Sequence, residues 1–248
     1  MKISIITVCW NAEDTISRCM SSVAQQNYSD YEHIVIDGSS TDSTVEIISR
    51  FRCDKTIVIS EPDKGIYDAM NKGLAMVSGE LVHFLNSDDS YADCNVLEDV
   101  VNKVSLGSSV VLGDVNYGTS KAPNIWHASA PTPRNIKFGW HPAHPGFFCK
   151  SEIYKRVGNF DQTYRISADF DLMMRIVLRN LSGVVCLGRV TTNMDPYGAS
   201  SSFAAIIEGN RNVAMSAKLN HISSVPWLYL VLRVVPKIKR KFISSWSL

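Results

Sequence analysis

Two adjacent aspartates, Asp88 and Asp89, directly follow an apolar segment and are the clearest indication of chemistry in the sequence. Like charges a few ångströms apart repel each other in a low dielectric, so the pair is costly unless a cation neutralises it. Mn²⁺ or Mg²⁺ fits this need, because such ions bind one or two carboxylates and take their other ligands from water and substrate phosphates. The pair therefore predicts a metal site that holds a diphosphate. The alternative is a helix cap in a polar turn.

Asp37 follows another apolar segment, and a carboxylate at the end of a strand can accept a hydrogen bond from a ring N–H or a ribose hydroxyl. The alternative is a tight turn over residues 38–40, with Asp42 as the cap of the next helix. The sequence contains neither a P-loop nor a dinucleotide-binding glycine fingerprint. Phosphates in this protein are therefore expected to be held by a metal ion.

A doubly wound α/β sheet is the scaffold that the first ~100 residues predict. Apolar segments that predict strands alternate with apolar residues at helical spacing, and strands that are apolar on both faces imply a parallel sheet with helices on both sides. The predicted strands are residues 3–8, 34–36, 57–59 and 81–85, and the predicted helices are residues 16–23, 45–51 and 66–77. Ligands bind beyond the carboxyl ends of such strands, so Thr7, Asp37 and Asp88 are expected to converge on one crevice.

The second half is less regular. A helix at 96–104 and a strand at 110–115 are followed by residues 116–148, which carry five prolines and two tryptophans and predict a packed functional loop. Regular structure is expected again as a helix at 172–178, a strand at 184–187 and a helix at 203–219.

The C-terminal segment 222–236 is apolar and aromatic, and it leads into Lys237, Lys239, Arg240 and Lys241. One interpretation is a last core helix with a solvated basic end. The other is an interfacial helix that lies on a membrane, because Trp and Tyr beside basic residues suit anionic headgroups and the apolar run is too short to span.

The composition is that of an ordinary globular protein, with 45% hydrophobic and 20% charged residues among 248 and a net charge of +1. This excludes disordered and collagen-like classes, and it argues against a nucleic-acid partner. The six cysteines form no Cys-x-x-Cys pair and are expected to be free thiols in a reducing cytosol. Neither a charged leader nor an 18-residue apolar run is present, so we expect a cytoplasmic protein, peripheral on the inner face of the cytoplasmic membrane.

Four blocks together resemble glycosyltransferase family 2, which has the GT-A fold, over about residues 1–190. The blocks are residues 3–8 (ISIITV), 35–42 (VIDGSSTD), 63–73 (DKGIYDAMNKG) and 84–89 (FLNSDD). The resemblance is closest to bacterial transferases that build surface polysaccharides such as lipopolysaccharide or capsule. It implies an inverting, metal-dependent transfer of a sugar from a nucleoside diphosphate sugar, UDP-linked by expectation, to a hydroxyl of a lipid-linked oligosaccharide.

The resemblance also implies roles on the donor side. Asp37 matches the aspartate that contacts the nucleotide base of the donor, and Thr7 lies at the wall of the same pocket. Asp88 faces the ribose and contributes to the metal site, and Asp89 coordinates the metal that bridges both phosphates. The other positions that line the donor site are Lys64 and Asp68.

On the acceptor side, residues 167–175 (SADFDLMMR) resemble the block that carries the catalytic base, and Asp169 is the expected base. An inverting displacement needs a carboxylate that removes the proton of the acceptor hydroxyl while a metal stabilises the departing diphosphate. Asp171 is the rival, although it could instead cap the helix or pair with Arg175. His144 matches an acceptor-side position, and residues 197–201 (YGASS) resemble a loop near the diphosphate.

The expected organisation is a GT-A domain over residues 1–220, with a nucleotide-sugar-binding half at 1–115 and an acceptor half at 116–220. A C-terminal helical extension with an amphipathic basic tail follows at 221–248. Two alternatives remain: a sugar-phosphate nucleotidyltransferase, which would need a basic glycine-rich loop where residues 11–14 read NAED, and a non-catalytic nucleotide-sugar-binding protein.

Overall fold

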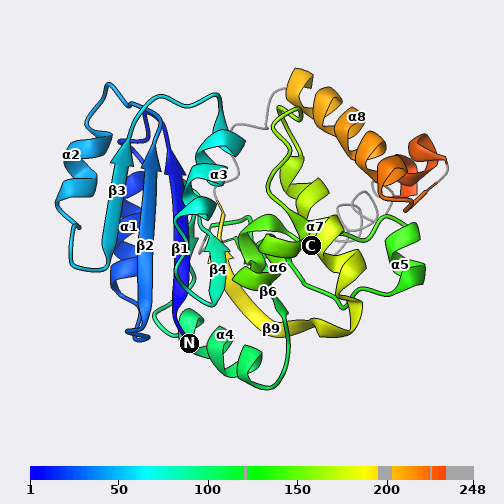
Figure 1. Ribbon diagram of the computed structural model, residues 1–248, viewed down its shortest axis with the longest axis horizontal. Coiled ribbons are helices and arrows are strands. Elements are labelled where there is room, and N and C mark those ends of the chain that lie inside the picture. Colours follow the sequence, from blue (N-terminus) through cyan, green and yellow to red (C-terminus); the bar gives the residue numbers. More distant parts are fainter. Residues whose placement is uncertain (120–121, 195–202, 224, 233–248) are drawn as a thin grey trace.

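The computed structural model describes residues 1–119, 122–194, 203–223 and 225–232. Its elements surround one sheet with helices on both faces (Figure 1). The loop expected at residues 197–201 and the basic residues after position 236 lie outside the described residues.

The first half builds the parallel part of the sheet, as the apolar segments predict. Strand β1 pairs in parallel with both β2 and β4, and β2 pairs in parallel with β3. The register places Cys9 opposite Asp37, so the polar segments after these strands start at the same edge. The four strands are β1 (Ile3–Cys9), β2 (Tyr31–Asp37), β3 (Thr56–Ser60) and β4 (Leu81–Phe84).

The second half extends the same sheet with mixed pairing. Strand β8 lies antiparallel between β4 and β6, and β9 is parallel to β6. Two short strands complete the sheet, β5 on β9 and β7 on β6. The order is β3-β2-β1-β4-β8-β6-β9-β5, so the two halves share one continuous sheet. These strands are β5 (Ser90–Tyr91), β6 (Val110–Asn116), β7 (Ile125–Trp126), β8 (Phe147–Lys150) and β9 (Val184–Asn193).

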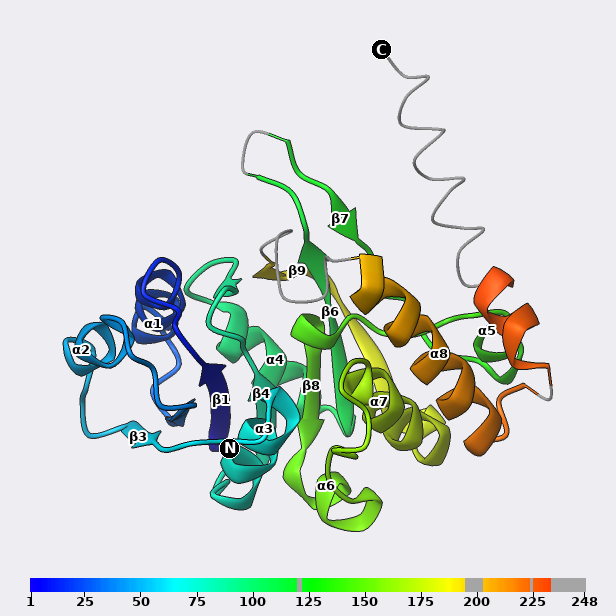
Figure 2. The same cartoon turned by 90° about the horizontal axis from the view of Figure 1, so that it is seen from above.

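Helices cover both faces of the sheet (Figure 2). On one face α1 (Ile16–Ala24), α2 (Thr44–Ser49) and α4 (Val96–Ser105) bury their apolar stripes. On the other face α3 (Ile66–Ala75), α6 (Ser151–Val157) and α7 (Ala168–Arg179) form the larger core, and α8 (Phe203–Leu219) packs outside α7. Helix α3 lies so close to β1 that a Cβ on Gly73 would come within 2.5 Å of the Ile6 side chain.

Residues 116–148 are packed against the protein, as expected, and contain short elements. Besides β7 they form α5 (Pro133–Lys137), which Thr132 and Asn135 close with a capping box, and the 3-10 turn His144–Gly146. Strand β8 and helix α6 were not predicted. The ring of Phe148 in β8 stacks on buried His83 of β4, with 3.9 Å between the ring centroids. The core position of β8 thus depends on a partner distant in sequence.

Residues 226–232 form a helix after α8. Its Tyr229 is fully buried and donates to the Trp140 carbonyl at 3.4 Å, whereas Trp227 is 67% exposed. Among the described residues, no helix combines the length and apolarity needed to cross a bilayer. The six cysteines are free thiols, of which Cys9, Cys19 and Cys149 are buried.

Candidate active site

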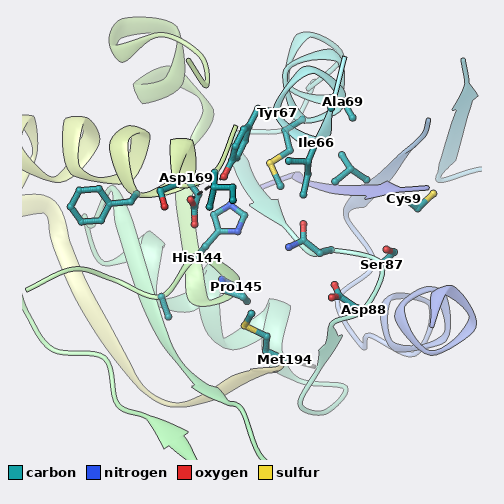
Figure 3. Close-up of a pocket in the computed structure, with 18 of the residues that line it drawn as sticks. Cys9, Ile66, Tyr67, Ala69, Ser87, Asp88, His144, Pro145, Asp169 and Met194 are labelled. Carbon is teal, nitrogen blue, oxygen red and sulfur yellow. Dashed lines mark hydrogen bonds between the residues drawn. The ribbon is translucent and has the colours of Figure 1, made fainter. Parts of the chain in front are cut away.

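A cavity of about 880 Å³ opens at the carboxyl ends of β1 and β4. It is lined by the segment after β1, the start of α3, the turn after β4, residues 141–145 and the start of α7. Both halves of the chain therefore contribute to it. Figure 3 shows Tyr67, His144 and Asp169 grouped at one end of the cavity, with Ser87 and Asp88 at the other.

Asp88 lines the cavity at the turn that follows β4. The amide of Asp89 donates to the Asn86 carbonyl at 3.0 Å, and Arg18 of α1 donates to the Asp88 carbonyl at 2.5 Å, which fixes this turn. The side chain of Asp89 is only 1% exposed and does not line the cavity. The geometry therefore gives the cavity-facing position of the predicted pair to Asp88, whereas Asp89 was expected to be the main metal ligand.

Potential metal ligands are sparse in this cavity. Within the described parts of the chain, no group of three or more His, Cys, Asp and Glu side chains could hold a metal ion. Asp88 supplies a hard oxygen donor at the cavity wall, and Mg²⁺ or Mn²⁺ can complete its ligand set from phosphates and water. The residues present thus fit an ion that is bound together with its substrate.

Asp37 and Thr7 lie behind the cavity wall and do not line it. The carboxylate of Asp37 is fully buried, and it accepts hydrogen bonds from the Ser60 hydroxyl at 2.6 Å and from both the amide and the hydroxyl of Ser40. The hydroxyl of Thr7 pairs with Nε2 of buried His33 at 2.9 Å. Of Thr7, Asp37 and Asp88, which were expected to converge on one crevice, only Asp88 lines this cavity.

Lys64 and Asp68, predicted on the donor side, also lie outside the cavity lining. Asp68 accepts from the Lys64 amide at 3.0 Å and from the Gln162 side chain at 3.1 Å, and it lies in the first turn of α3. The carboxylate therefore stabilises the start of α3 and ties it to the loop before α7. The Lys64 side chain is exposed.

Asp169 is positioned by the turn that starts α7. Ser167 adopts a left-handed conformation with φ 69°, and the helix begins at the next residue, so Asp169 lies in the first turn and lines the cavity. The Tyr67 hydroxyl donates to Asp169 Oδ1 at 3.3 Å. Burial, with the neighbouring charge of Asp169, raises the pKa of Tyr67, so this hydroxyl keeps its proton and orients the carboxylate.

His144 lies near Asp169 in the cavity. Its Nε2 is shielded from solvent and has no hydrogen-bond partner among the described residues. Burial lowers the pKa of His144, and the charge of Asp169 opposes that shift. The imidazole of His144 is thus favoured in its neutral form, and the residue lines the cavity beside Asp169.

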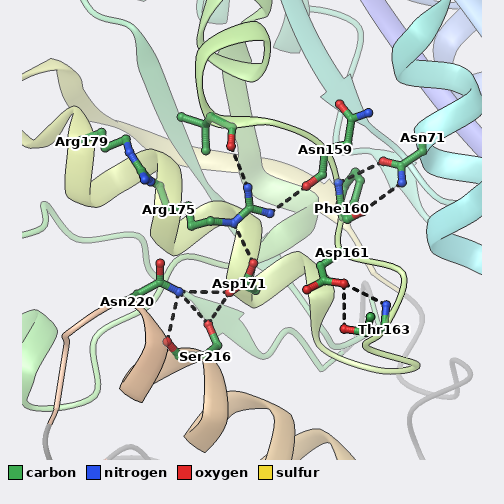
Figure 4. Close-up of polar contacts among 11 residues, drawn as sticks. Asn71, Asn159, Phe160, Asp161, Thr163, Asp171, Arg175, Arg179, Ser216 and Asn220 are labelled. Carbon is green, nitrogen blue, oxygen red and sulfur yellow. Dashed lines mark hydrogen bonds and ion pairs between the residues drawn. The ribbon is translucent and has the colours of Figure 1, made fainter.

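Asp171 belongs to a structural network (Figure 4). Its carboxylate pairs with Arg175 Nε at 2.7 Å and accepts from Ser216 at 2.7 Å and from Asn220 at 3.0 Å. It is buried and does not line the cavity. These contacts favour the alternative role of Asp171, pairing with Arg175, and they attach α8 to α7.

Several polar or aromatic residues of the cavity were not predicted from the sequence, among them Asp63, Tyr67, Arg165 and Tyr117. Asp63 and Tyr67 stand inside a block that was singled out, one position away from the residues chosen. The signal for Arg165 was its position four residues before Asp169.

The family profile described as Glycosyl transferase family 2 matches residues 4–174. The chain belongs to this family. It is 26% identical over 240 residues to the PGL/p-HBAD biosynthesis glycosyltransferase of Mycobacterium bovis (strain BCG / Pasteur 1173P2), covering 95% of this chain and 91% of that relative. The recognition made from the four sequence blocks is confirmed, and the family 2 protein is an enzyme, a glycosyltransferase.

Two other similarities bear on this family 2 glycosyltransferase. The chain is 28% identical over 202 residues, 79% of its length and 76% of the relative, to an Escherichia coli enzyme named UDP-Glc:alpha-D-GlcNAc-diphosphoundecaprenol beta-1,3-glucosyltransferase WfaP. The structure of Staphylococcus aureus TarS residues 1–349 in complex with UDP-GlcNAc superposes with a TM-score of 0.74 and 21% identity, over 95% of this chain and 73% of that one. The predicted α/β GT-A fold is thus confirmed.

Proposed function

We propose that this enzyme transfers a sugar, with inversion, from a nucleoside diphosphate sugar to a hydroxyl of a lipid-linked oligosaccharide in surface polysaccharide biosynthesis. One observation carries the proposal: Asp88 and Asp169 reach the same cavity from different halves of the chain. Residues 1–115 would form the donor half, residues 116–220 the acceptor half, and residues 221–248 an appended tail.

Asp169 is the proposed catalytic base. An acceptor hydroxyl that approaches the cavity end formed by Tyr67, His144 and Asp169 can give its proton to the free oxygen of the Asp169 carboxylate. Tyr67 holds the other oxygen, which limits the rotation of the carboxylate. His144 lines the same end of the cavity, where its ring can pack against the acceptor sugar and so orient it.

Asp88 is the proposed metal ligand, with Asp89 as the buried residue behind it. A bound Mn²⁺ or Mg²⁺ would stabilise the negative charge of the departing diphosphate. Asp88 would hold this ion at the end of the cavity opposite to Asp169. Asp37 is buried beside the cavity wall. It would contact the nucleotide base of the donor once the side chains of Ser40 and Ser60, which now bond its carboxylate, have moved away.

The names of the relatives support the substrate classes. TarS binds a UDP-sugar, and the E. coli relative is named for a UDP-sugar donor and a sugar on diphosphoundecaprenol. A UDP-linked donor and an acceptor on a lipid diphosphate are therefore the substrates we propose. A peripheral position on the inner face of the cytoplasmic membrane would bring the enzyme to such an acceptor.

The decisive experiment incubates the purified protein with a panel of nucleotide sugars, with and without Mn²⁺, and measures the release of nucleoside diphosphate. We expect release from a UDP-sugar that depends on the metal and is lost in Asp88→Asn. The matched control is Asp63→Asn, which removes another carboxylate of the cavity lining but should leave the metal dependence intact. Full activity of Asp88→Asn at limiting Mn²⁺ would contradict the metal role.

The membrane role is tested separately with vesicles. Replacing Lys237, Lys239, Arg240 and Lys241 by Gln should release the protein from anionic vesicles, since each basic residue contributes about 1 kcal/mol near such a surface. Co-sedimentation measures the effect. These four substitutions are preferable to a truncation after His221. A truncation would also remove Tyr229, which is buried in the core, and would therefore disturb the fold. Unchanged sedimentation with vesicles would refute the membrane proposal.

A further inference from the structure

Arg165 is the one lysine or arginine among the described residues that line the cavity. The same lining carries three carboxylates, those of Asp63, Asp88 and Asp169. A single guanidinium at the rim of a cavity that must accept anionic substrates can provide a local site for an anion.

The side chain of Arg165 makes no hydrogen bond or ion pair with the described parts of the chain, although it is exposed and has five donors. Arg175, ten residues later, shows the contrast: it bonds Asp171 and the carbonyls of Val157 and Asn159. A guanidinium that holds the fold together is bonded in this way. The fold does not use that of Arg165.

The backbone around Arg165 is nevertheless held in place. Asn71 of α3 bonds both the amide and the carbonyl of Phe160, at 3.0 and 2.9 Å. On the other side of Arg165, Asn212 of α8 donates to the Ile166 carbonyl at 2.8 Å. Arg165 thus lines the cavity from a loop that is bonded on both sides.

We propose that Arg165 forms an anion subsite that binds the diphosphate of the acceptor, an inference that rests on the proposed function. Arg165 stands in the loop that leads into α7, four residues before Asp169, the proposed base in the first turn of that helix. When the acceptor carries a single sugar on its lipid diphosphate, as the name of the E. coli relative describes, a sugar hydroxyl at Asp169 places the anomeric diphosphate one sugar ring away. The donor diphosphate belongs to the opposite end of the cavity, at Asp88.

Helix α8 supplies a second observation that favours a lipid-linked anion. The loop after Arg165 packs on α8 so closely that a Cβ on Gly209 would lie 3.2 Å from Ile166. Within one turn of Gly209, the α8 side chains of Ile206 and Ile207 are 50% and 48% exposed. An acceptor whose diphosphate meets Arg165 can therefore extend its lipid chain along an apolar helix surface.

The first test measures binding of farnesyl diphosphate and of UDP with Mn²⁺ to the full chain, by calorimetry. Arg165→Gln should weaken farnesyl diphosphate binding by about 10-fold to 100-fold, the loss expected for charge-assisted hydrogen bonds, and leave UDP binding unchanged. The affinity of Arg165→Lys for farnesyl diphosphate should lie between those of the parent and of Arg165→Gln. Arg52→Gln is the control, because Arg52 is an exposed arginine outside the cavity lining.

Three results would overturn the inference. The first is that the parent does not bind farnesyl diphosphate, and the second is that the parent and Arg165→Gln bind it equally. The third is that Arg165→Gln weakens the binding of UDP and not that of farnesyl diphosphate, which would place the donor diphosphate at Arg165. Inorganic pyrophosphate serves as a further probe, and it should respond to Arg165→Gln but bind more weakly than farnesyl diphosphate.

A second test uses sugar transfer to two acceptors that carry the same sugar, one on a polyprenyl diphosphate and one on an uncharged alkyl chain. Arg165→Gln should raise KM for the charged acceptor by about 10-fold to 100-fold and leave KM for the uncharged one and for the donor unchanged. An equal change for both acceptors would contradict the inference. Failure of the proposed function would differ: the parent would transfer no sugar, yet still bind farnesyl diphosphate through Arg165.

Discussion

Asp169 and Asp171 lie two residues apart on α7 and have opposite environments. Asp169 lines the cavity and receives one hydrogen bond from Tyr67, whereas the buried carboxylate of Asp171 receives three side-chain partners. Because their spacing on a helix directs them to different faces, one can act on substrate while the other holds two helices together.

The two aspartates should therefore respond differently to the same substitution. Asp169→Asn is expected to lower kcat by about 10²- to 10⁴-fold, because it removes a general base, with little change in the free energy of unfolding. Asp171→Asn is expected to lower the free energy of unfolding by about 2–3 kcal/mol, because it leaves Arg175 without its charged partner.

Steady-state kinetics and urea unfolding of both variants make the comparison. Asp171→Asn should keep near-parental kcat at a temperature where it is folded. If Asp171→Asn abolished catalysis without loss of stability, the base would have to be reassigned.

At this scale the sequence reveals which residues stand at strand ends and helix starts, and it placed Asp88, His144 and Asp169 in segments that line the cavity. It could not reveal which carboxylates are buried. Ser60 of β3 covers Asp37, and Ser216 of α8 covers Asp171. The sequence pattern around Asp37 or Asp171 contains no trace of these distant partners.

Among the elements, α3 links the two halves of the site. Its Tyr67 bonds Asp169 and stacks on Phe160, with ring centroids 5.6 Å apart, and its Asn71 bonds the Phe160 backbone twice. The loop before α7 is thus fixed to a helix of the donor half.

Asn71→Ala should loosen this attachment. Loss of both bonds leaves a partly buried amide and carbonyl unpaired, so we expect the free energy of unfolding to fall by about 1–3 kcal/mol. We also expect a several-fold loss of kcat, because Phe160 supports the ring of Tyr67. Urea unfolding and initial rates measure the two effects.

Gln162→Ala is the matched control. It also removes a hydrogen bond between this loop and α3, but that bond is exposed and joins the Gln162 side chain to Asp68 without involving the Phe160 backbone. A loss of stability as large as that of Asn71→Ala would show that any bond to the loop suffices.

Periodicity was enough to locate most helices and strands of the first half, because each has its own apolar pattern. Strand β8 escaped detection because it is only four residues long and follows a proline-rich segment. Its place in the sheet comes from β4 and β6, which lie on either side of it.

For the whole molecule, buried histidines contribute to how stability depends on pH below 6.5. His33 and His83 are almost inaccessible, and burial lowers their pKa from 6.5 to about 4 and about 3. Between these values and 6.5 the unfolded chain binds more protons than the folded one, so protonation favours unfolding. The stability that these two histidines contribute is complete above pH 6.5 and is lost as the pH falls below it.

We expect the free energy of unfolding to decrease from pH 6.5 toward pH 4, with each of the two histidines contributing up to about 1.4 kcal/mol per pH unit. Urea unfolding at a series of pH values measures this slope. His33→Gln, whose amide can still bond Thr7, should reduce the slope by about the share of one histidine. An unchanged slope in that variant would contradict the assignment to His33.

The shared sheet has a consequence for how the protein is made. Strand β4 emerges from the ribosome well before β8, so a growing chain presents the unpaired edge of an apolar strand throughout that interval. A chain that ends between residues 116 and 146 would keep Asp88, lack the proposed base and expose the unpaired edge of β4. Such a product would be prone to aggregation, so a nonsense mutation in this interval is expected to cause aggregation as well as the loss of activity.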